Sequence, residues 1–454
     1  MVVALQRSAL LRAAACAGAG ALSLPRRWSA AAAAAPGDQL ELVHVSLYFR
    51  HGARTPLFGM ETGVVQGQSW SACGESARLS AAVDAGADAV LRLRSLGTAG
   101  TAPPPSAVDA KQRETVLPGG GRAGELTATG LAQGRSLGRR LRSRYGAALE
   151  IDDSDFWWSR VEARTTHVAR CVLTLRSVLL GLGAAAASDF GKPVAVDVLH
   201  SSRETLTPNL RACDRLAGFW DRVRAARQVA PPPVDAPGLA SLLRKVPADN
   251  GFNFPAARVP LKDALIAIAS AGGALPWGVT LDELQALDDL AAADVAELLG
   301  VGAAAGDLDA KRDVLRLGAG PLCAELRDAL QSATANDRPT LRLMSGHDTT
   351  VKPLLVALDI YDHKWPPFCA CVALEVYRAP TGAHFVRVLY DGATADSCFG
   401  APSDFYVAID LQDLDAFLAK LDALALAGPD WRAACRCDDA PAAADSAATG
   451  GSSF

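Results

Sequence analysis

The chain has 454 residues and a mass of 47.2 kDa, which exceeds one average domain but suits a large α/β unit with an insertion. Its 45 basic and 49 acidic residues, with a pI of about 6.0, give no electrostatic reason to expect a nucleic-acid partner or an anionic membrane. Ten cysteines over this length do not make a disulfide scaffold, and their spacing lacks the companion histidines of a zinc site. We expect thiols with at most one or two disulfides, and no metal or other cofactor.

Residues 1–37 differ in composition from the rest of the chain. Four arginines lie among Ala, Leu and Ser, and no acidic residue precedes Asp38. This composition is typical of an organellar transit peptide, so we expect a targeting segment, mitochondrial rather than chloroplast. A secretory signal is the alternative, although Arg12 interrupts its apolar run. No run of about 18 apolar residues predicts a transmembrane segment.

A strand pattern leads into a short charged run near the start of the expected domain. Residues 43–49 alternate with the period of two that is typical of a strand with one buried face. The run RHGARTP follows, so His51 lies at the carboxyl end of this strand, between Arg50 and Arg54. Ligands of open α/β sheets bind at that edge. Because the guanidinium fork suits a tetrahedral oxyanion, the pattern indicates phosphate chemistry.

The next segments combine a long loop with a helix. Residues 59–123 are interrupted by TAPPPS and PGGG and predict a loop-rich segment, which we expect to form part of the active-site rim. GELTATG, residues 124–130, then opens an amphipathic helix. A third segment, RTTHVAR, runs into a helical pattern. Thr165 or Thr166 is the expected N-cap, which would put Arg170 on the first turns of that helix.

Residues 184–318 read as mostly helical, and the pattern indicates a helical cap inserted between two halves of one core. LRLMSGHDTT then predicts a short strand that ends at Gly346. His347 and Asp348 follow in the turn, and Thr349 begins the next helix. Two strand ends would therefore present one histidine each.

The C-terminal part predicts a hairpin and a closing helix. DHKWPPF, residues 362–368, precedes two strand patterns that we expect to pair as an antiparallel hairpin at the edge of the sheet. A helix is expected within residues 411–424. The low-complexity tail, residues 438–454, predicts disorder.

Three of these segments resemble the signatures of the histidine acid phosphatase family. RHGARTP matches RHGxRxP at every fixed position, HDTT matches H-D-x-T, and RTTHVAR differs from R-S-T-x-x-x-R only by Thr165 in place of serine. The resemblance implies that His51 is the nucleophile and that Asp348 is the proton donor. It also implies four phosphate ligands, Arg50, Arg54, Arg170 and His347.

Arg164 matches the first arginine of its motif, and we expect it to support the site. The resemblance implies an α/β fold, with a mixed central sheet flanked by helices and a mainly helical cap. The expected parts are a targeting segment (1–37), a core (38–183 and 319–430), a cap (184–318) and a disordered tail (438–454).

The implied function is metal-independent hydrolysis of phosphate monoesters through a phosphohistidine. DHKWPPF resembles the lysophosphatidic acid phosphatase branch of the family, so the expected substrate is that lipid or a similar lipid phosphate. A broad-specificity acid phosphatase or phytase-like enzyme is the alternative. A phosphoglycerate mutase-like enzyme fits less well, because His347-Asp348 differs from the G-H-G setting of that branch. A non-catalytic phosphoester-binding protein also stays open, and the sequence leaves the oligomeric state undetermined.

Overall fold

The computed structural model describes residues 40–96, 101–153, 156–183, 193–229, 237–301, 308–392 and 405–436. The expected targeting segment, residues 1–37, and the expected disordered tail, residues 438–454, lie outside these ranges. Within the ranges, no helix combines the length and the apolar character needed to cross a membrane.

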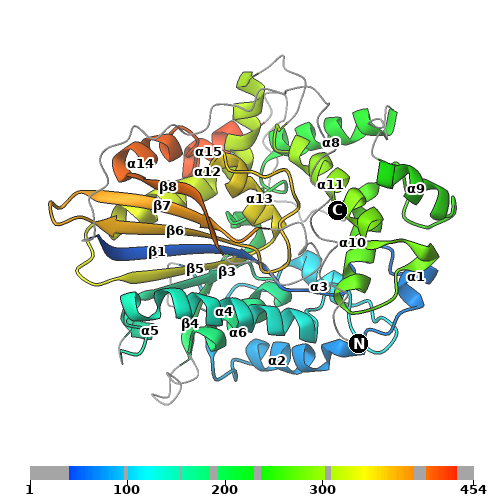
Figure 1. The fold of residues 1–454 in the computed structure, drawn as a ribbon, viewed down its shortest axis with the longest axis horizontal. Helices are drawn as coiled ribbons and strands as arrows, with labels where there is room; N and C mark the ends of the chain where they lie inside the picture. Colours follow the sequence, from blue (N-terminus) through cyan, green and yellow to red (C-terminus); the bar gives the residue numbers. More distant parts are fainter. Residues whose placement is uncertain are drawn as a thin grey trace, which may run out of the picture. The chain divides into compact units, whose positions relative to one another are not determined.

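A mixed sheet of eight strands forms the centre of the described fold, in the order β2-β4-β3-β5-β1-β6-β7-β8 (Figure 1). The strands are β1 (Glu41–Arg50), β2 (Leu91–Ser95), β3 (Val161–Thr165), β4 (Val194–Val198), β5 (Thr340–Gly346), β6 (Cys371–Arg378), β7 (His384–Tyr390) and β8 (Tyr406–Asp413). The pairs among β1 to β5 are parallel, and the pairs that join β1, β6, β7 and β8 are antiparallel. The predicted α/β class and the hairpin of β6 and β7 are confirmed. The hairpin is not the edge of the sheet, however, because β8 pairs outside it.

Strand β1 is more deeply buried than its alternating pattern predicts. Every residue from Val43 to Arg50 is buried, because β5 and β6 flank the strand and helices lie on both faces of the sheet. Its polar side chains have partners there. His44 lies 2.7 Å from the hydroxyl of Thr340, and the Tyr48 hydroxyl accepts a hydrogen bond of 2.8 Å from Arg342.

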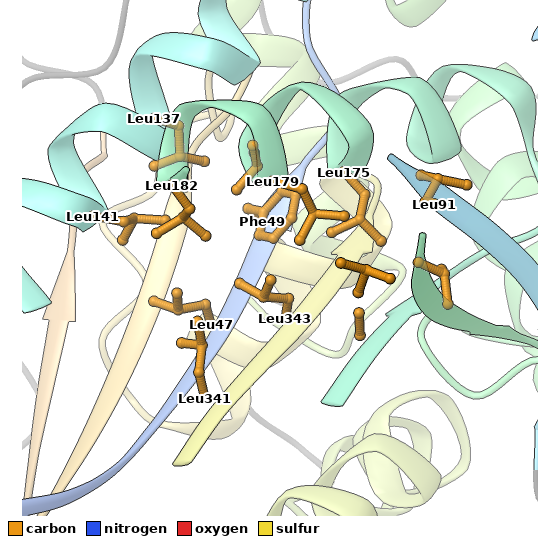
Figure 2. Close-up of a cluster of buried hydrophobic side chains, with 14 of the residues drawn as sticks. Leu47, Phe49, Leu91, Leu137, Leu141, Leu175, Leu179, Leu182, Leu341 and Leu343 are labelled. Carbon is orange, nitrogen blue, oxygen red and sulfur yellow. The ribbon is translucent and has the colours of Figure 1, made fainter. Parts of the chain in front are cut away.

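Helices cover both faces of the sheet (Figure 1). One face packs against α4 (Ala128–Leu149) and α6 (Ala169–Leu182), and the leucines of both helices meet Leu47, Phe49 and Leu343 (Figure 2). The other face carries α12 (Leu308–Ala333), α13 (Asp348–Ala357) and α14 (Leu414–Asp422). Shorter helices are α2 (Gly74–Asp84), α3 (Ala107–Arg113), α5 (Phe156–Ser159) and α15 (Gly428–Ala434).

Two glycines allow the first turn of α4 to approach the loop after β1. A Cβ on Gly52 would lie 2.5 Å from the carbonyl oxygen of Gly130, and a Cβ on Gly130 would lie 2.2 Å from that of Ala53. Neither distance is compatible with a side chain. The glycines of RHGARTP and GELTATG therefore hold the loop that carries His51 against a helix.

The cap region contains two separate groups of helices. α9 (Pro237–Lys245), α10 (Arg258–Ser270) and α11 (Leu281–Glu297) build a second hydrophobic core with α1 (Gly63–Gln66) and Trp70. α8 (Asp214–Val229) instead packs against α12 and α15. A disulfide between Cys213 and Cys435 links the start of α8 to the end of α15.

The structure differs from the sequence interpretation in three segments. Residues 411–413, expected within the closing helix, belong to β8, and α14 begins at Leu414. Residues 194–198, inside the range expected to be helical, form β4 in the central sheet. A five-residue segment with four apolar residues is too short to distinguish a buried strand from a helix by periodicity. Residues 59–123, expected to be loop-rich, contain α1, α2, α3 and the edge strand β2. The outer face of β2 is exposed and polar, which weakened its apolar signal.

Candidate active site

Two neighbouring parallel strands bring the predicted histidines together. β1 and β5 pair in a register that sets Arg50 opposite Gly346, so His51 and His347 leave the sheet side by side. Their ring centroids lie 5.4 Å apart in an edge-on arrangement. Thr166, which follows β3, holds His347 through a contact of 3.0 Å between its hydroxyl and Nε2. The predicted juxtaposition of the two strand ends is confirmed.

His51 is held as a neutral imidazole with one nitrogen free of hydrogen. Its Nδ1 lies 2.9 Å from the carbonyl oxygen of Gly52. Because a carbonyl only accepts, Nδ1 must carry the hydrogen, which leaves the lone pair on Nε2. Burial, with Arg170, Arg50 and Arg54 nearby, lowers the pKa of His51 well below its usual value. The ring therefore keeps a nucleophilic nitrogen even in acid solution.

Three buried arginines surround this imidazole with unused donors. Within the described residues, Arg50 Nε, Arg54 Nε, and both Nε and Nη1 of Arg170 are buried without a hydrogen-bond partner. Buried polar groups in folded proteins are almost always paired. A guanidinium that keeps a free edge at such a depth is suited to an anion that the protein alone does not supply. The three edges therefore form a candidate phosphate site.

The first turns of two helices lie at the same edge of the sheet. α6 begins at Ala169, so Arg170 is its second residue, and α13 begins at Asp348. The partial positive charge of these helix ends favours an anion. The N-cap of α6 is Val168, so the predicted cap at Thr165 or Thr166 is wrong. Thr165 is still paired in β3, and the hydroxyl of Thr166 contacts His347.

Asp348 faces the same space and is fully engaged in hydrogen bonds. Its Oδ2 lies 3.0 Å from Arg50 Nη2 and accepts a 3.0 Å bond from Trp365 Nε1, while Oδ1 accepts from the backbone of Thr349. Burial alone would raise the pKa of Asp348, but Arg50 and the neighbouring cations lower it well below the usual range. Asp348 is therefore a carboxylate in this structure.

Residues of the cap complete the site, and the sequence did not reveal them. Asp263 of α10 binds both terminal nitrogens of Arg54, at 2.7 and 3.3 Å, and accepts from the backbone of Leu57. This pairing holds the guanidinium by one edge and leaves its Nε free. Lys262, the preceding residue, lies over the ring of Trp365. No local motif marks α10, so only the tertiary contact identifies these residues.

Arg164 has different partners from the three arginines around His51. It is 1% exposed and binds Glu204 at 2.8 Å through Nη2, and Glu325 through Nη1. The hydroxyl of Thr205 takes a further bond of 2.7 Å from Nη2. Carboxylates thus bind both terminal nitrogens, while Nε has no partner among the described residues. The supporting role of Arg164 stays a prediction.

A cavity of about 270 Å³ opens beside Arg170 and His347. Its apolar lining consists of Val108, Val168, Leu199, Pro208, Leu210 and Trp220. The α3 segment contributes to this wall, which agrees with the rim expected from residues 59–123. Trp365 and Phe368, which DHKWPPF suggested as an apolar wall, do not line it. Phe368 packs under Arg50, with the guanidinium carbon 4.3 Å from the ring centroid.

The fold and the cation-rich site define the class of protein. Residues 41–391 match the model of the histidine phosphatase superfamily (branch 2), and the chain belongs to this family. It is therefore a phosphatase that hydrolyses phosphate monoesters.

Individual relatives agree with this assignment. The chain is 30% identical over 363 residues to lysophosphatidic acid phosphatase type 6 of Bos taurus, and the match covers 78% of each chain. It is 28% identical over 402 residues to the protein of that name from Homo sapiens, covering 87% of this chain and 86% of the other. The solved structure of the Klebsiella sp ASR1 phytase superposes with a TM-score of 0.52 at 16% identity, over 87% of this chain and 98% of that chain. The last comparison concerns the fold alone.

Proposed function

We propose that this phosphatase acts on lysophosphatidic acid, or a similar lipid phosphate monoester, through a phosphohistidine formed on His51. The observation that carries the mechanism is the set of unpaired guanidinium edges around a neutral histidine. The phosphoryl group binds to Arg50, Arg54, Arg170 and His347. These donors stabilise the negative charge on the oxygens in the transition state.

In the first step His51 Nε2 attacks phosphorus and the ester P–O bond breaks. The departing alkoxide needs a proton, and Asp348 is the carboxyl group next to Arg50 that supplies it. Bound phosphate raises the pKa of Asp348, because its charge opposes the carboxylate and competes for Arg50. In the second step water attacks the phosphohistidine, Asp348 takes its proton, and phosphate leaves.

The cavity beside the site supports a substrate with one phosphate on an apolar body. Its charged side chains are Arg170 and Arg211, together with the carboxylates of Asp109 and Glu204. Asp109 lies 3.6 Å from Arg170, so this lining offers little excess positive charge to a second phosphate. An acyl or glyceryl group would instead meet the apolar side chains. The two relatives that carry the name lysophosphatidic acid phosphatase support the same choice.

The chain-length dependence of kcat/KM tests the substrate. We expect kcat/KM for lysophosphatidic acids to rise about tenfold for each two methylenes buried, since each contributes about 0.8 kcal/mol. Glycerol phosphate is the reference without an acyl chain. A flat profile, or inositol hexakisphosphate as the best substrate, would leave a phosphatase of broad or phytase-like specificity and remove the lipid proposal.

The composition of residues 1–37 supports import into mitochondria, as a separate proposal. A fluorescent reporter fused behind these residues is expected in mitochondria. Its appearance in chloroplasts would change only the organelle, and its secretion would overturn the transit-peptide proposal.

A further inference from the structure

Trp365 connects the expected proton donor to two buried lysines. Its indole Nε1 donates to Oδ2 of Asp348 at 3.0 Å. The Nζ atom of Lys262 lies 3.3 Å from the ring centroid of Trp365, and that of Lys352 lies 4.1 Å from it. Two cations thus lie within cation–π range of a ring whose N–H binds a carboxylate.

Both lysines are buried at an energetic cost that needs a compensating interaction. Lys262 is 3% exposed and Lys352 1% exposed. Lys262 pairs with Asp288 of α11 at 3.0 Å, and Lys352 donates to the backbone oxygen of Ala292 at 3.3 Å. Burial is the main reason why the pKa of Lys352 is lowered to about 7, with the neighbouring cations adding to it. Neither lysine belongs to the motifs or to the cavity described above.

We infer that Trp365 is a positioning residue, held by Lys262 and Lys352, that orients Asp348 and sets the pH range over which it protonates the leaving group. This inference rests on the proposed function, in which Asp348 is the proton donor. It also gives DHKWPPF a role in the reaction that is separate from binding an acyl chain.

The indole N–H of Trp365 orients the Asp348 carboxyl group independently of Arg50. Arg50 must divide its donors among the backbone oxygen of Pro366, Asp348 and a bound phosphoryl group. The single N–H of Trp365 serves only Asp348, so it keeps the carboxyl group oriented when phosphate engages Arg50. Cations over the ring draw electron density from it and strengthen the N–H as a donor.

The hydrogen bond from Trp365 determines in which direction the variant changes the pKa of Asp348. A donor to the ionised form lowers the pKa of a carboxyl group, so loss of the indole N–H raises the pKa of Asp348. Several charged or titratable groups act on this carboxylate or on the lysines beside it: Arg50, Arg54, Arg170, Lys262, Asp288, His347, Lys352, Tyr361 and Asp362. Trp365→Phe leaves all of them in place. The variant therefore isolates the hydrogen bond while keeping an aromatic ring for the two lysines.

The test compares pH profiles of kcat, which report the enzyme–substrate complex, for an alkyl phosphate and for 4-nitrophenyl phosphate. Trp365→Phe should move the alkaline limb for the alkyl ester upward by about one pH unit and reduce its maximum by about tenfold. The nitrophenyl ester needs little protonation, and its rate should stay within about twofold. Trp431→Phe is the matched control, since it also removes one indole bond, to the Leu317 oxygen at 2.9 Å, in the α15 helix.

Lys352→Met is the second variant if Trp365→Phe does not fold. Removing this cation should shift the same limb in the same direction, because a positive charge beside a carboxylate lowers its pKa. An unshifted limb, or an equal loss for both esters, would overturn the inference. Asp348→Asn distinguishes a failure of the proposed function from a failure of the inference about Trp365. If it slows both esters equally, the proposed proton donor is wrong. If it is selective while Trp365→Phe is not, only the role of Trp365 fails.

Discussion

Two groups of buried arginines in this protein differ in how their charge is compensated. Around His51, Arg50, Arg54 and Arg170 each keep at least one buried nitrogen without a partner among the described residues. In the second group, Arg164 binds two carboxylates through its terminal nitrogens, and Arg342 binds Glu162 at 2.9 Å and the Tyr48 hydroxyl. Arg164 also keeps an unpaired Nε, so the difference lies in the ion pairs. Among the described residues, each arginine of the first group faces one carboxylate, whereas Arg164 and Arg342 each face two.

The difference separates a ligand site from a structural network. A buried guanidinium bound by carboxylates already has the partners it needs, so its removal should cost stability. An arginine that faces a single carboxylate and lies beside His51 gains a further partner when an anion binds, so its removal should cost activity. Charge alone does not distinguish the two groups, because all five side chains are arginines with little exposure.

The largest expected effect concerns the imidazole at the centre of the first group. His51→Ala should lower kcat by at least about 10⁴-fold, because the covalent route is lost while the arginines remain. Binding of inorganic phosphate should persist, since the free guanidinium edges are intact. Steady-state kinetics and phosphate titration measure both. A variant that keeps a tenth of the activity would contradict the nucleophile assignment.

The next effect concerns Asp348, the ion-pair partner of Arg50 and the expected proton donor. Asp348→Asn should slow alkyl phosphates by about 10² to 10⁴-fold, and nitrophenyl phosphate far less, because a good leaving group does not need the proton. The ratio of the two rates is the measurement. Equal slowing would mean that Asp348 acts only through its charge.

Arg170 and Arg164 offer the most direct contrast between the groups. Arg170→Ala should lower kcat/KM by about 10² to 10³-fold with little loss of stability. Arg164→Ala should destabilise the fold by about 3–5 kcal/mol, because Glu204 and Glu325 would lose their buried partner. Denaturant unfolding and kinetics on both variants give a two-by-two comparison. The contrast fails if Arg164→Ala is fully stable or if Arg170→Ala is fully active.

A smaller effect is the pH dependence of the unfolding free energy. It involves two buried histidines, one near each group of arginines. Burial is the main cause that lowers the pKa of His44, near Arg342, and of His347 to about 3. The unfolded chain, with histidine pKa values near 6.5, binds protons that the native state does not. Stability should therefore be complete above about pH 6.5 and should decline toward pH 3 by about 1.4 kcal/mol per pH unit for each histidine.

His44→Asn should reduce the slope of unfolding free energy against pH by the contribution of one histidine, about 1.4 kcal/mol per pH unit, and should leave the active site unchanged. Unfolding free energies measured between pH 6.5 and 4.5 in the parent and the variant give the difference. An unchanged slope would show that His44 is protonated in the native state.

The sequence predicted those parts of the site that local signals determine. RHGARTP and HDTT each follow a recognisable strand, and the parallel register of β1 and β5 then fixes His51 beside His347. The partners of these residues were not predictable. Asp263 reaches Arg54 across 209 residues, and α10 carries no signal that distinguishes it from an ordinary cap helix.

The fold likewise contains elements that the sequence predicted and elements that it did not. Long periodic segments such as α4 and the hairpin of β6 and β7 were predicted, whereas β2, β3, β4 and β8 were missed. β4 is five residues long, and β8 is partly exposed, so neither gives a strong apolar pattern. The pairing of Cys213 with Cys435 joins positions 222 residues apart, which spacing in the sequence cannot reveal.

Trapping the covalent intermediate tests the central claim most directly. Rapid quenching of the full-length enzyme with a labelled phosphate monoester, followed by peptide mapping, should find the label on the peptide that contains His51. The bond should be labile in acid and stable in base, and His51→Ala should not be labelled. A label on serine, aspartate or His347, or turnover without any labelled protein, would contradict the account.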